Sequence, residues 1–276
     1  MNPTHPSLAL LTDMDGTLLH PDKSLTPGNA KAIADFRAKG GLFSIATGRG
    51  LQATLPYLDQ LQPDFPVILY NGAMVYDWQH QSIIASCTLP SETTLLIEEM
   101  LSFSPQIAVE LLNRDGVYIV KDNEYEQQHM KITRITPQYR NLEEMDITQC
   151  YKTLFAGDPR DIDRLWEFVQ QPQFAALSFT RSHSWFLEML PPSVSKGAAV
   201  ETIRKVLPTG TRLGTSGDYN NDLTMLAAAD WAACPADAQP IVKEQIRQIG
   251  GYASPCTCAE DFFADWTAQF VSRYTK

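Results

Sequence analysis

The sequence predicts an α/β protein: a doubly wound parallel sheet with an inserted α+β cap domain. Both ends of the chain alternate short apolar runs with helical stretches, the pattern of parallel strands joined by crossover helices. The middle of the chain carries a hairpin signature instead, which indicates antiparallel strands. A chain of 276 residues, 44% hydrophobic and 20% charged, is large enough to fill two such cores.

The first segment begins with an apolar run, Ser-Leu-Ala-Leu-Leu at 7–11, which predicts a buried parallel strand. Thr26 has the residue type of an N-cap and Pro27 suits the first helical position, so we expect a helix from there to the stop signal Gly40-Gly41. The further elements expected in this segment are a strand at 42–46, a helix at 51–58 and a strand at 67–70.

Polar residues stand where these three strands end, namely Asp13, Thr47 and Asn71. The carboxyl ends of parallel strands meet at one edge of an open α/β sheet, and ligands bind along that edge. We therefore expect the functional site there.

From about residue 83 the pattern changes. Runs at 107–112 and 117–120 flank Asn113-Arg114-Asp115-Gly116, a hairpin turn sequence. The further elements expected here are strands at 151–155, 174–180 and 185–189 and a helix at 161–169. Together they predict a separate α+β unit over residues 84–190.

Pro191-Pro192 marks the end of that unit, and the first pattern then returns. The expected elements are a helix from Lys196, a strand at 212–215, a helix at 221–228, a strand at 231–233 and a helix near Ile241. We therefore expect residues 1–83 and 191–276 to form one discontinuous, Rossmann-like core, with 84–190 inserted as the cap.

The formal charge of −10 argues against nucleic acid as a partner, because nucleic-acid binding depends on clustered Lys and Arg. No apolar stretch approaches the ~20 residues of a membrane span, and the N-terminus lacks the pattern of a signal peptide. We expect a cytoplasmic protein, a monomer or weak homodimer, that binds neither nucleic acid nor membrane. The five cysteines lack the paired spacing of a zinc site, and we expect loop thiols at Cys256 and Cys258.

Asp13 and Asp15 are two carboxylates at a strand end, and Gly16 lets the backbone turn tightly beside them. Such a pair can divide the work of a reaction when its two environments separate the pKa values. Asp-Gly is also a common surface turn, so the pair alone leaves catalysis and a turn equally open.

A second acidic cluster, Gly217 to Asp222, follows a predicted strand and precedes a helix. If this loop converges with the first on the sheet edge, carboxylates of the two loops together offer the hard oxygen ligands that suit Mg²⁺. Helix capping by Asn220 or Asn221 is an alternative that can hold at the same time.

Two further residues suit a phosphate group. Lys196 falls at a helix start, where the helix dipole disfavours a cation unless an anion compensates it. Thr47 offers a hydroxyl and neighbouring N–H groups at a strand-to-helix turn. The alternatives are a solvated surface lysine and a simple helix cap.

In this order the segments resemble the motifs of the haloacid dehalogenase (HAD) superfamily, and within it the Cof-type sugar-phosphatase branch. The segments that carry the resemblance are Asp13 to Leu19, Thr47-Gly48-Arg49, Lys196-Gly197 and Gly217 to Asp222. Asn71-Gly72-Ala73 and the position of the cap also match, so the similarity spans nearly the whole chain. The sequence departs from the usual pattern at Thr12, at Met14 and over 234–238, without loss of a catalytic group.

The resemblance implies a phosphatase in which Asp13 attacks phosphorus and forms an aspartyl-phosphate, while Asp15 acts as general acid and base. It implies Mg²⁺ as cofactor, bound by Asp13, the backbone carbonyl of Asp15, and Asp218. The residues implied to hold the phosphate are Thr47, Gly48, Lys196, Asn221 and Asn71, with Asp222 and Gly16 in supporting roles. Arg49 is left open between a structural ion pair and a substrate contact.

The implied substrate is a small phosphorylated metabolite, and the branch points to a sugar phosphate. Two alternatives stay open: a phosphomutase or phosphotransferase on the same core, and a non-catalytic phosphometabolite-binding module. The cap is expected to close over the site and supply specificity. Its candidate residues, each of which also suits the surface or the cap core, are Arg114, Tyr118, His129, Arg181, His183 and Trp185.

Overall fold

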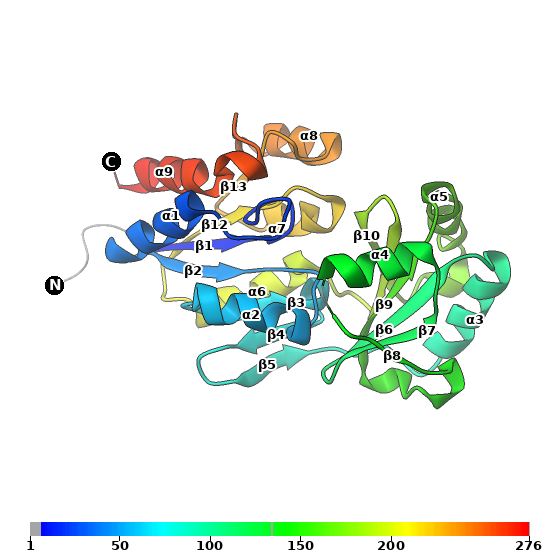
Figure 1. The fold of residues 1–276 in the computed structure, drawn as a ribbon. Coiled ribbons are helices and arrows are strands. Elements are labelled where there is room, and N and C mark those ends of the chain that lie inside the picture. Colours follow the sequence, from blue (N-terminus) through cyan, green and yellow to red (C-terminus); the bar gives the residue numbers. More distant parts are fainter. Residues whose placement is uncertain (1–6, 134, 276) are drawn as a thin grey trace.

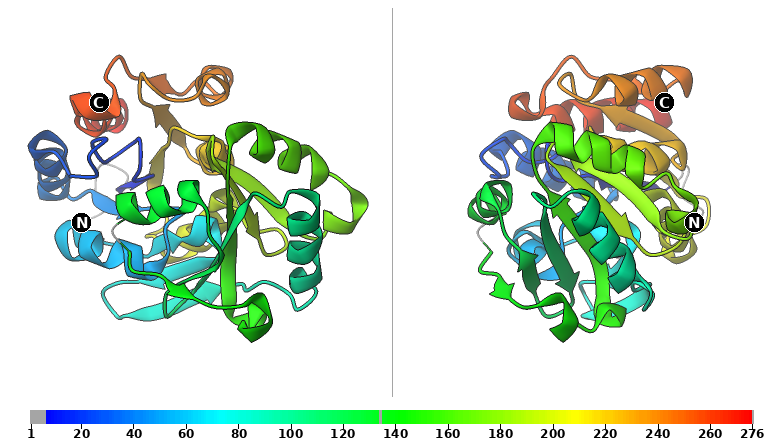
Figure 2. Two further views of the ribbon diagram at one scale, coloured as in Figure 1. Left: turned by 45° about the vertical axis from the view of Figure 1, so that its right-hand side comes forward. Right: turned by 90° about the vertical axis from the view of Figure 1, so that its right-hand side faces the viewer.

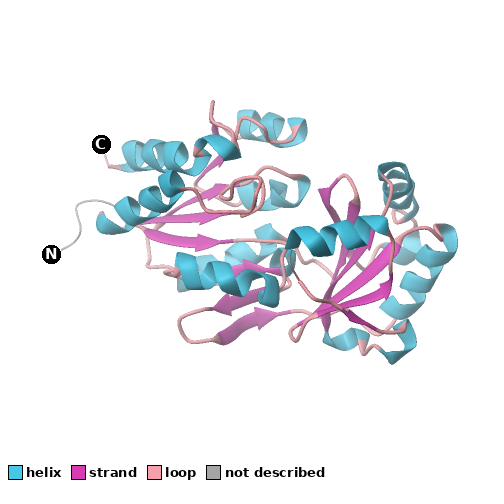
Figure 3. Cartoon of the chain, viewed as in Figure 1, coloured by secondary structure: helices cyan, strands magenta, loops and turns pink. Residues whose placement is uncertain are grey.

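The computed structural model describes residues 7–133 and 135–275, which form two sheet-containing bodies side by side (Figure 1). Strands between residues 8 and 86 and between 212 and 253 belong to the first body, and the strands at 108–190 form the sheet of the second. Figure 3 shows the strands of the two bodies as separate groups, each flanked by helices.

The first body is built on a parallel sheet in the order β14-β13-β12-β1-β2. Its strands are β1 (Leu8–Thr12), β2 (Leu42–Ile45), β12 (Arg212–Ser216), β13 (Trp231–Cys234) and β14 (Tyr252–Ala253). The predicted α/β class is confirmed, and strands from the two ends of the chain pair directly, as β1 and β12 do. The carboxyl ends of β1, β2 and β12 therefore meet at one edge.

Helices cover both faces of this sheet. They are α1 (Pro27–Ala38), α2 (Leu51–Leu61), α6 (Lys196–Val206), α7 (Leu223–Ala227), α8 (Pro240–Gln248) and α9 (Phe262–Tyr274). Thr26 caps α1, and its hydroxyl accepts the Asn29 N–H at 3.1 Å. Leu10 packs with the aromatic residues of α1 and α9, whereas Leu11 packs with α6, because neighbouring strand residues face opposite sides. No helix within the described residues is both long and apolar enough to cross a bilayer.

The third predicted strand differs from expectation in its pairing. β3 (Val67–Leu69) forms an antiparallel sheet with β4 (Met74–Asp77) and β5 (Ser82–Ser86), and only a bridge between Ala46 and Ile68 joins β3 to the parallel sheet. The cause is the 3₁₀ turn Tyr70–Gly72, in which Asn71 has a left-handed φ of 56° and reverses the chain. β5 runs across the domain boundary predicted at 83/84. The division of the chain into domains stays a prediction.

The second body is a six-stranded sheet in the order β10-β11-β9-β6-β7-β8. Its strands are β6 (Ala108–Asn113), β7 (Val117–Lys121), β8 (Gln138–Tyr139), β9 (Cys150–Ala156), β10 (Ser178–His183) and β11 (Phe186–Leu190). Its helices are α3 (Thr93–Phe103), α4 (Glu124–Thr133) and α5 (Pro159–Phe168). α3 and α5 pack on the face away from the first body, and α4 lies on the side toward it (Figures 1 and 2). We call this second body the cap.

Replacing Phe263 by Ala tests the packing of α9 against the parallel sheet. The Phe263 ring is fully buried and meets the Phe43 ring edge-on, with 5.4 Å between the centroids. We expect the free energy of unfolding to fall by about 3–5 kcal/mol in urea or guanidinium titrations. Leu95→Ala is the control, because Leu95 is 68% exposed and its truncation is expected to change stability by less than about 0.5 kcal/mol. Equal effects of the two substitutions would contradict this packing.

Candidate active site

Asp13 follows β1 directly and opens a tight turn in which the N–H groups of Leu18 and Leu19 both donate to the Met14 carbonyl, at 3.1 and 2.9 Å. Within this turn Gly16 has a φ of +78°, which favours glycine. A Cβ added there would lie 2.5 Å from Asp218 Oδ2, so glycine also lets the two acidic loops approach. The turn and the Asp218 loop are therefore fitted to each other.

Lys196, the first residue of α6, is completely buried between two carboxylates. Its Nζ lies 2.5 Å from Asp13 Oδ1 and 2.7 Å from Asp222 Oδ1. These ion pairs hold the pKa of Lys196 above its usual range in spite of burial. The two carboxylates also offset the unfavourable interaction between this cation and the dipole at the helix N-terminus.

Carboxylates outnumber cations at this point. Asp13, Asp218 and Asp222 offer oxygen atoms within 4.8 Å of one another, and Lys196 is the cation that contacts two of them. Burial raises the pKa of Asp13 to about 7, Lys196 opposes that rise, and Asp222 adds to it. Burial and the charges of Asp13 and Asp222 raise the pKa of Asp218 as well. A buried set of hard oxygen donors with excess negative charge fits a divalent cation such as Mg²⁺.

The loop after β12 is held by its own side chains. Asp222 Oδ2 accepts the backbone N–H groups of Asp218 and Tyr219 at 3.0 and 3.1 Å, and Thr17 Oγ1 donates to Asp218 Oδ1 at 2.8 Å. Asp222 therefore both fixes this loop and contacts Lys196, while the Asp218 carboxylate is directed at the Asp13 turn.

Asp15 is clamped by two cations. Arg49 binds it in a bidentate manner, Nε to Oδ2 at 2.6 Å and Nη2 to Oδ1 at 2.7 Å, and Lys23 Nζ lies 2.8 Å from Oδ1. Burial alone would raise the pKa of Asp15, but Arg49 and Lys23 hold it well below the usual range. In this arrangement Asp15 is a carboxylate. The sequence left the partner of Arg49 open and gave no reason to select Lys23.

The phosphate candidates divide into two groups. Thr47, Gly48 and Asn221 line a cavity that Asp13, Asp15 and Asp218 also line. Asn71 and Lys196 are fully buried and are not among the lining residues. The Asn71 amide is occupied, since its Nδ2 donates to Glu188 Oε2 at 2.5 Å and its Oδ1 accepts from Asn221 Nδ2 at 3.0 Å. It contacts the cap and the neighbouring loop in this structure.

A buried charge pair joins the cap to the first body. Lys152 Nζ on β9 lies 2.9 Å from Glu188 Oε2 on β11 and donates to the Gly48 carbonyl oxygen at 2.7 Å. Ser182 also donates to Glu188. Sequence reasoning missed both members of the pair, although each is a charged residue inside an apolar strand run, which is a usable signal.

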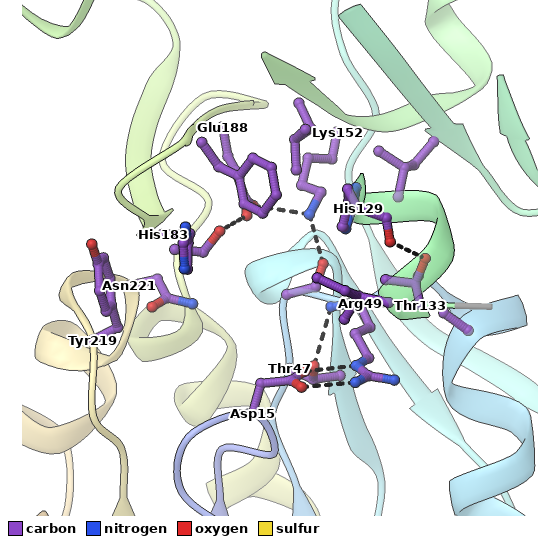
Figure 4. Close-up of a pocket in the computed structure, with 18 of the residues that line it drawn as sticks. Asp15, Thr47, Arg49, His129, Thr133, Lys152, His183, Glu188, Tyr219 and Asn221 are labelled. Carbon is purple, nitrogen blue, oxygen red and sulfur yellow. Dashed lines mark hydrogen bonds and ion pairs between the residues drawn. The ribbon is translucent and has the colours of Figure 1, made fainter. Parts of the chain in front are cut away.

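The cavity of about 370 Å³ lies between the two bodies, with carboxylates and Arg49 at one end and cap side chains at the other (Figure 4). Of the cap candidates from the sequence, His129, His183 and Trp185 line it. Arg114, Tyr118 and Arg181 are not among its lining residues; Arg181 instead pairs with Asp163, an exposed residue of α5.

Comparisons with known proteins find a family model, curated relatives and solved structures that this chain resembles. A family model described as haloacid dehalogenase-like hydrolase matches residues 10–254. An HMP-PP phosphatase of Escherichia coli is 27% identical over 243 residues, which cover 86% of this chain and 87% of that protein. A crystal structure of a haloacid dehalogenase-like hydrolase from Bacteroides thetaiotaomicron has a TM-score of 0.79 at 19% identity, covering 95% of this chain and 99% of that one. A sugar phosphatase of HAD subclass IIB has a TM-score of 0.81 at 19% identity, covering 96% and 99%.

Replacing Gly16 by Ala tests the fit between the two acidic loops. We expect kcat/KM to fall by about 100-fold or more, because a Cβ 2.5 Å from Asp218 must displace a group whose position the reaction depends on. Gly40→Ala is the matched control: Gly40 has a similar φ of +83° but nothing within 4 Å of the added Cβ. It is expected to lose about 1 kcal/mol of stability from backbone strain and to keep its kinetics. Equal kinetic losses in both variants would refute the role given to the close approach.

Proposed function

The chain belongs to the haloacid dehalogenase-like hydrolase family and is a phosphatase, and from this premise we propose that it hydrolyses a small phosphorylated metabolite through an aspartyl-phosphate on Asp13. The observation that carries the proposal is the buried convergence of Asp13, Lys196 and Asp218 at one sheet edge. Asp15 faces the same cavity, which gives the site a second carboxylate for proton transfer.

In the first step the Asp13 carboxylate attacks phosphorus in line, and the bond from phosphorus to the ester oxygen breaks. Lys196, 2.5 Å from Asp13 Oδ1, favours the ionised form of the nucleophile and orients it. Thr47, Gly48 and Asn221 line the cavity beside Asp13 and are suited to hold phosphoryl oxygens. The product is an alcohol and a phosphorylated Asp13.

Asp15 would give a proton to the departing ester oxygen and later take one from the water that hydrolyses the phosphorylated Asp13. In the structure Arg49 and Lys23 hold Asp15 as a carboxylate. An arriving phosphate competes for the same two cations, and losing them raises the pKa of Asp15 toward that of a usable proton donor. The exchange links protonation of Asp15 to the presence of substrate.

Asp13, Asp218 and the backbone carbonyl of Asp15 would hold the proposed Mg²⁺. The excess of buried carboxylates over cations supports a divalent ion at this place. When bound, Mg²⁺ would screen the repulsion between an anionic nucleophile and an anionic phosphate.

For the substrate we propose a compound of the size of a sugar phosphate. A cavity of about 370 Å³ supports a small leaving group. A structural neighbour named as a sugar phosphatase supports a small metabolite of this kind. If the acceptor is water, one inorganic phosphate is released per alcohol formed, whereas a mutase or phosphotransferase leaves the phosphate on a second hydroxyl.

Replacing Asp13 by Asn is expected to lower kcat by at least about 10⁴-fold, because the carboxylate that forms the covalent intermediate is gone. Acid quenching of the wild-type enzyme with a ³²P-labelled substrate should yield labelled protein, and Asp13→Asn should yield none. Asp35→Asn, an exposed Asp on α1, is the matched control and should keep both activity and label. Label that persists in Asp13→Asn would exclude Asp13 as the nucleophile.

Removing the metal ion tests the carboxylate set independently. A chelator is expected to abolish hydrolysis, and added Mg²⁺ to restore it. In Asp218→Asn the Mg²⁺ concentration for half-maximal activity should rise by about 100-fold, because one anionic ligand is lost. The wild-type requirement should be kept in Asp35→Asn. Full activity of the wild-type protein after exhaustive chelation would disprove the metal requirement.

A further inference from the structure

The side of the cavity formed by the cap, here called the cap wall, contains a second buried charged cluster. It consists of Glu110, Glu126 and His129, and the proposed reaction does not use it. Glu110 lies on β6, and Glu126 and His129 lie three residues apart on the same side of α4. His129 Nδ1 is 3.2 Å from Glu110 Oε2 and 3.6 Å from Glu126 Oε1. Both carboxylates are almost completely buried, whereas His129 keeps 18% of its side chain exposed.

The charges of this cluster are balanced within it. The three groups contact one another, and within the described residues neither oxygen of Glu126 has a hydrogen-bond partner. Burial opposes the charging of His129, but Glu110 and Glu126 raise its pKa to about 10. Burial and the charge of Glu110 raise the pKa of Glu126 to about 8, which favours its protonated form. The cluster is therefore an ion pair between the Glu110 carboxylate and the His129 imidazolium, with Glu126 packed against His129.

Strand register places this pair at the cavity. Glu110 and Glu188 both lie opposite Leu154 in the cap sheet, so all three side chains are on the face toward the first body, and all three line the cavity. Glu188 is fully used by Lys152, Asn71 and Ser182. Glu110 is the cap carboxylate in this lining that has no Lys, Arg or amide partner among the described residues.

The Lys and Arg side chains that line the cavity within the described residues all have anionic partners. Lys152 is held by Glu188 and the Gly48 carbonyl and is only 5% exposed; Figure 4 shows its Glu188 contact. Lys23 and Arg49 bind Asp15 at the end where the phosphate must lie. A second anion on the leaving group would therefore lose its hydration without gaining an unpaired cation, since the His129 imidazolium is already balanced by Glu110.

The rest of the cap wall is largely apolar. Its lining side chains include Leu112, Ile132, Leu154, Trp185 and Phe186. The other polar side chains in this part of the lining are Thr133, Ser182 and His183. Thr133 donates to backbone carbonyls of α4 and Ser182 donates to Glu188, so the Glu110–His129 pair is the charged group left to meet a leaving group. One carboxylate next to one imidazolium presents an acceptor beside a donor, which suits a hydroxyl or an amine.

We propose that Glu110 and His129 form the subsite that recognises the leaving group, and that the cap selects phosphate esters of uncharged, hydrogen-bonding alcohols over esters that carry a second anion. The inference rests on the proposed phosphatase function and names the substrate class of the same site. Glu126 acts through the other two residues and is a positioning residue.

Three esters built on one scaffold test this selection: phenyl phosphate, 4-(hydroxymethyl)phenyl phosphate and 4-carboxyphenyl phosphate, each assayed with Mg²⁺. The selectivity is the ratio of kcat/KM for the hydroxymethyl ester to kcat/KM for the carboxy ester. We expect a wild-type ratio of about 100 or more, because the carboxylate of the substrate would be buried without an unpaired cation to bind. A ratio near 1 in the wild-type enzyme overturns the proposal without any variant.

Two substitutions change the ratio in opposite directions. Glu110→Gln leaves the His129 cation without its anionic partner, so that it can bind the carboxylate of the substrate, and should lower the ratio by about tenfold or more. His129→Gln removes the cation that balances Glu110 and should raise the ratio. A general loss of folded protein cannot produce opposite changes, because each ratio is measured within one variant. Glu244→Gln, an exposed change of the same charge on α8, should keep the wild-type ratio.

The outcomes separate this inference from the phosphatase proposal. If wild-type enzyme with Mg²⁺ hydrolyses none of the three esters, including phenyl phosphate, the proposed function itself fails. If phenyl phosphate is hydrolysed but the ratio is unchanged in both Glu110→Gln and His129→Gln, the phosphatase proposal stands and the recognition subsite is refuted.

Discussion

The site depends on one constraint: a buried ammonium group, that of Lys196, must be matched by carboxylates. An unpaired buried charge is strongly disfavoured, so Lys196 requires both Asp13 and Asp222 at hydrogen-bond distance. Asp13 is 183 positions away in the sequence, so this contact ties the end of β1 to the start of α6. Lys196 leaves Asp218 without a cationic partner among the described residues, and this unmatched carboxylate is the physical ground on which we propose a metal ion there.

A second buried ion pair, Lys152 and Glu188, also needs hydrogen-bond partners from a distant part of the chain. Lys152 and Glu188 belong to the cap, but Gly48 and Asn71 of the first body complete their hydrogen bonds. The hydrogen bond from Lys152 to the Gly48 carbonyl therefore forms only when the cap lies against the Thr47–Gly48 turn. Removing either partner of such a pair alone would leave a buried charge, at a cost of about 3–5 kcal/mol. In this structure the pair joins the cap to the first body beside the site.

The sequence predicts the parts of the molecule that depend on local pattern. The alternation of strands and helices places Asp13 and Thr47 at one sheet edge, and the cation expected to need compensation at Lys196 finds it in the structure. α9 was missed although its aromatic residues recur at helical spacing, and α4 was missed because its face is only weakly apolar. Glu110 and Glu188 face one cavity only because β6, β9 and β11 pair in a particular register. Pairing between distant strands is not encoded in local spacing.

Specificity and chemistry therefore have different origins in this chain. The reacting groups come from strand ends, where topology alone brings them together, and the loops that hold them are short. The cap side of the cavity comes from β6, β9, β10 and β11 together with α4, whose inward faces must be matched in charge as well as in shape. Because the Lys and Arg residues there are paired within the described residues, the selection we propose acts against a second charge on the substrate. This selectivity depends on how all charged residues of the cavity are paired, so it cannot be read from any single residue of the sequence.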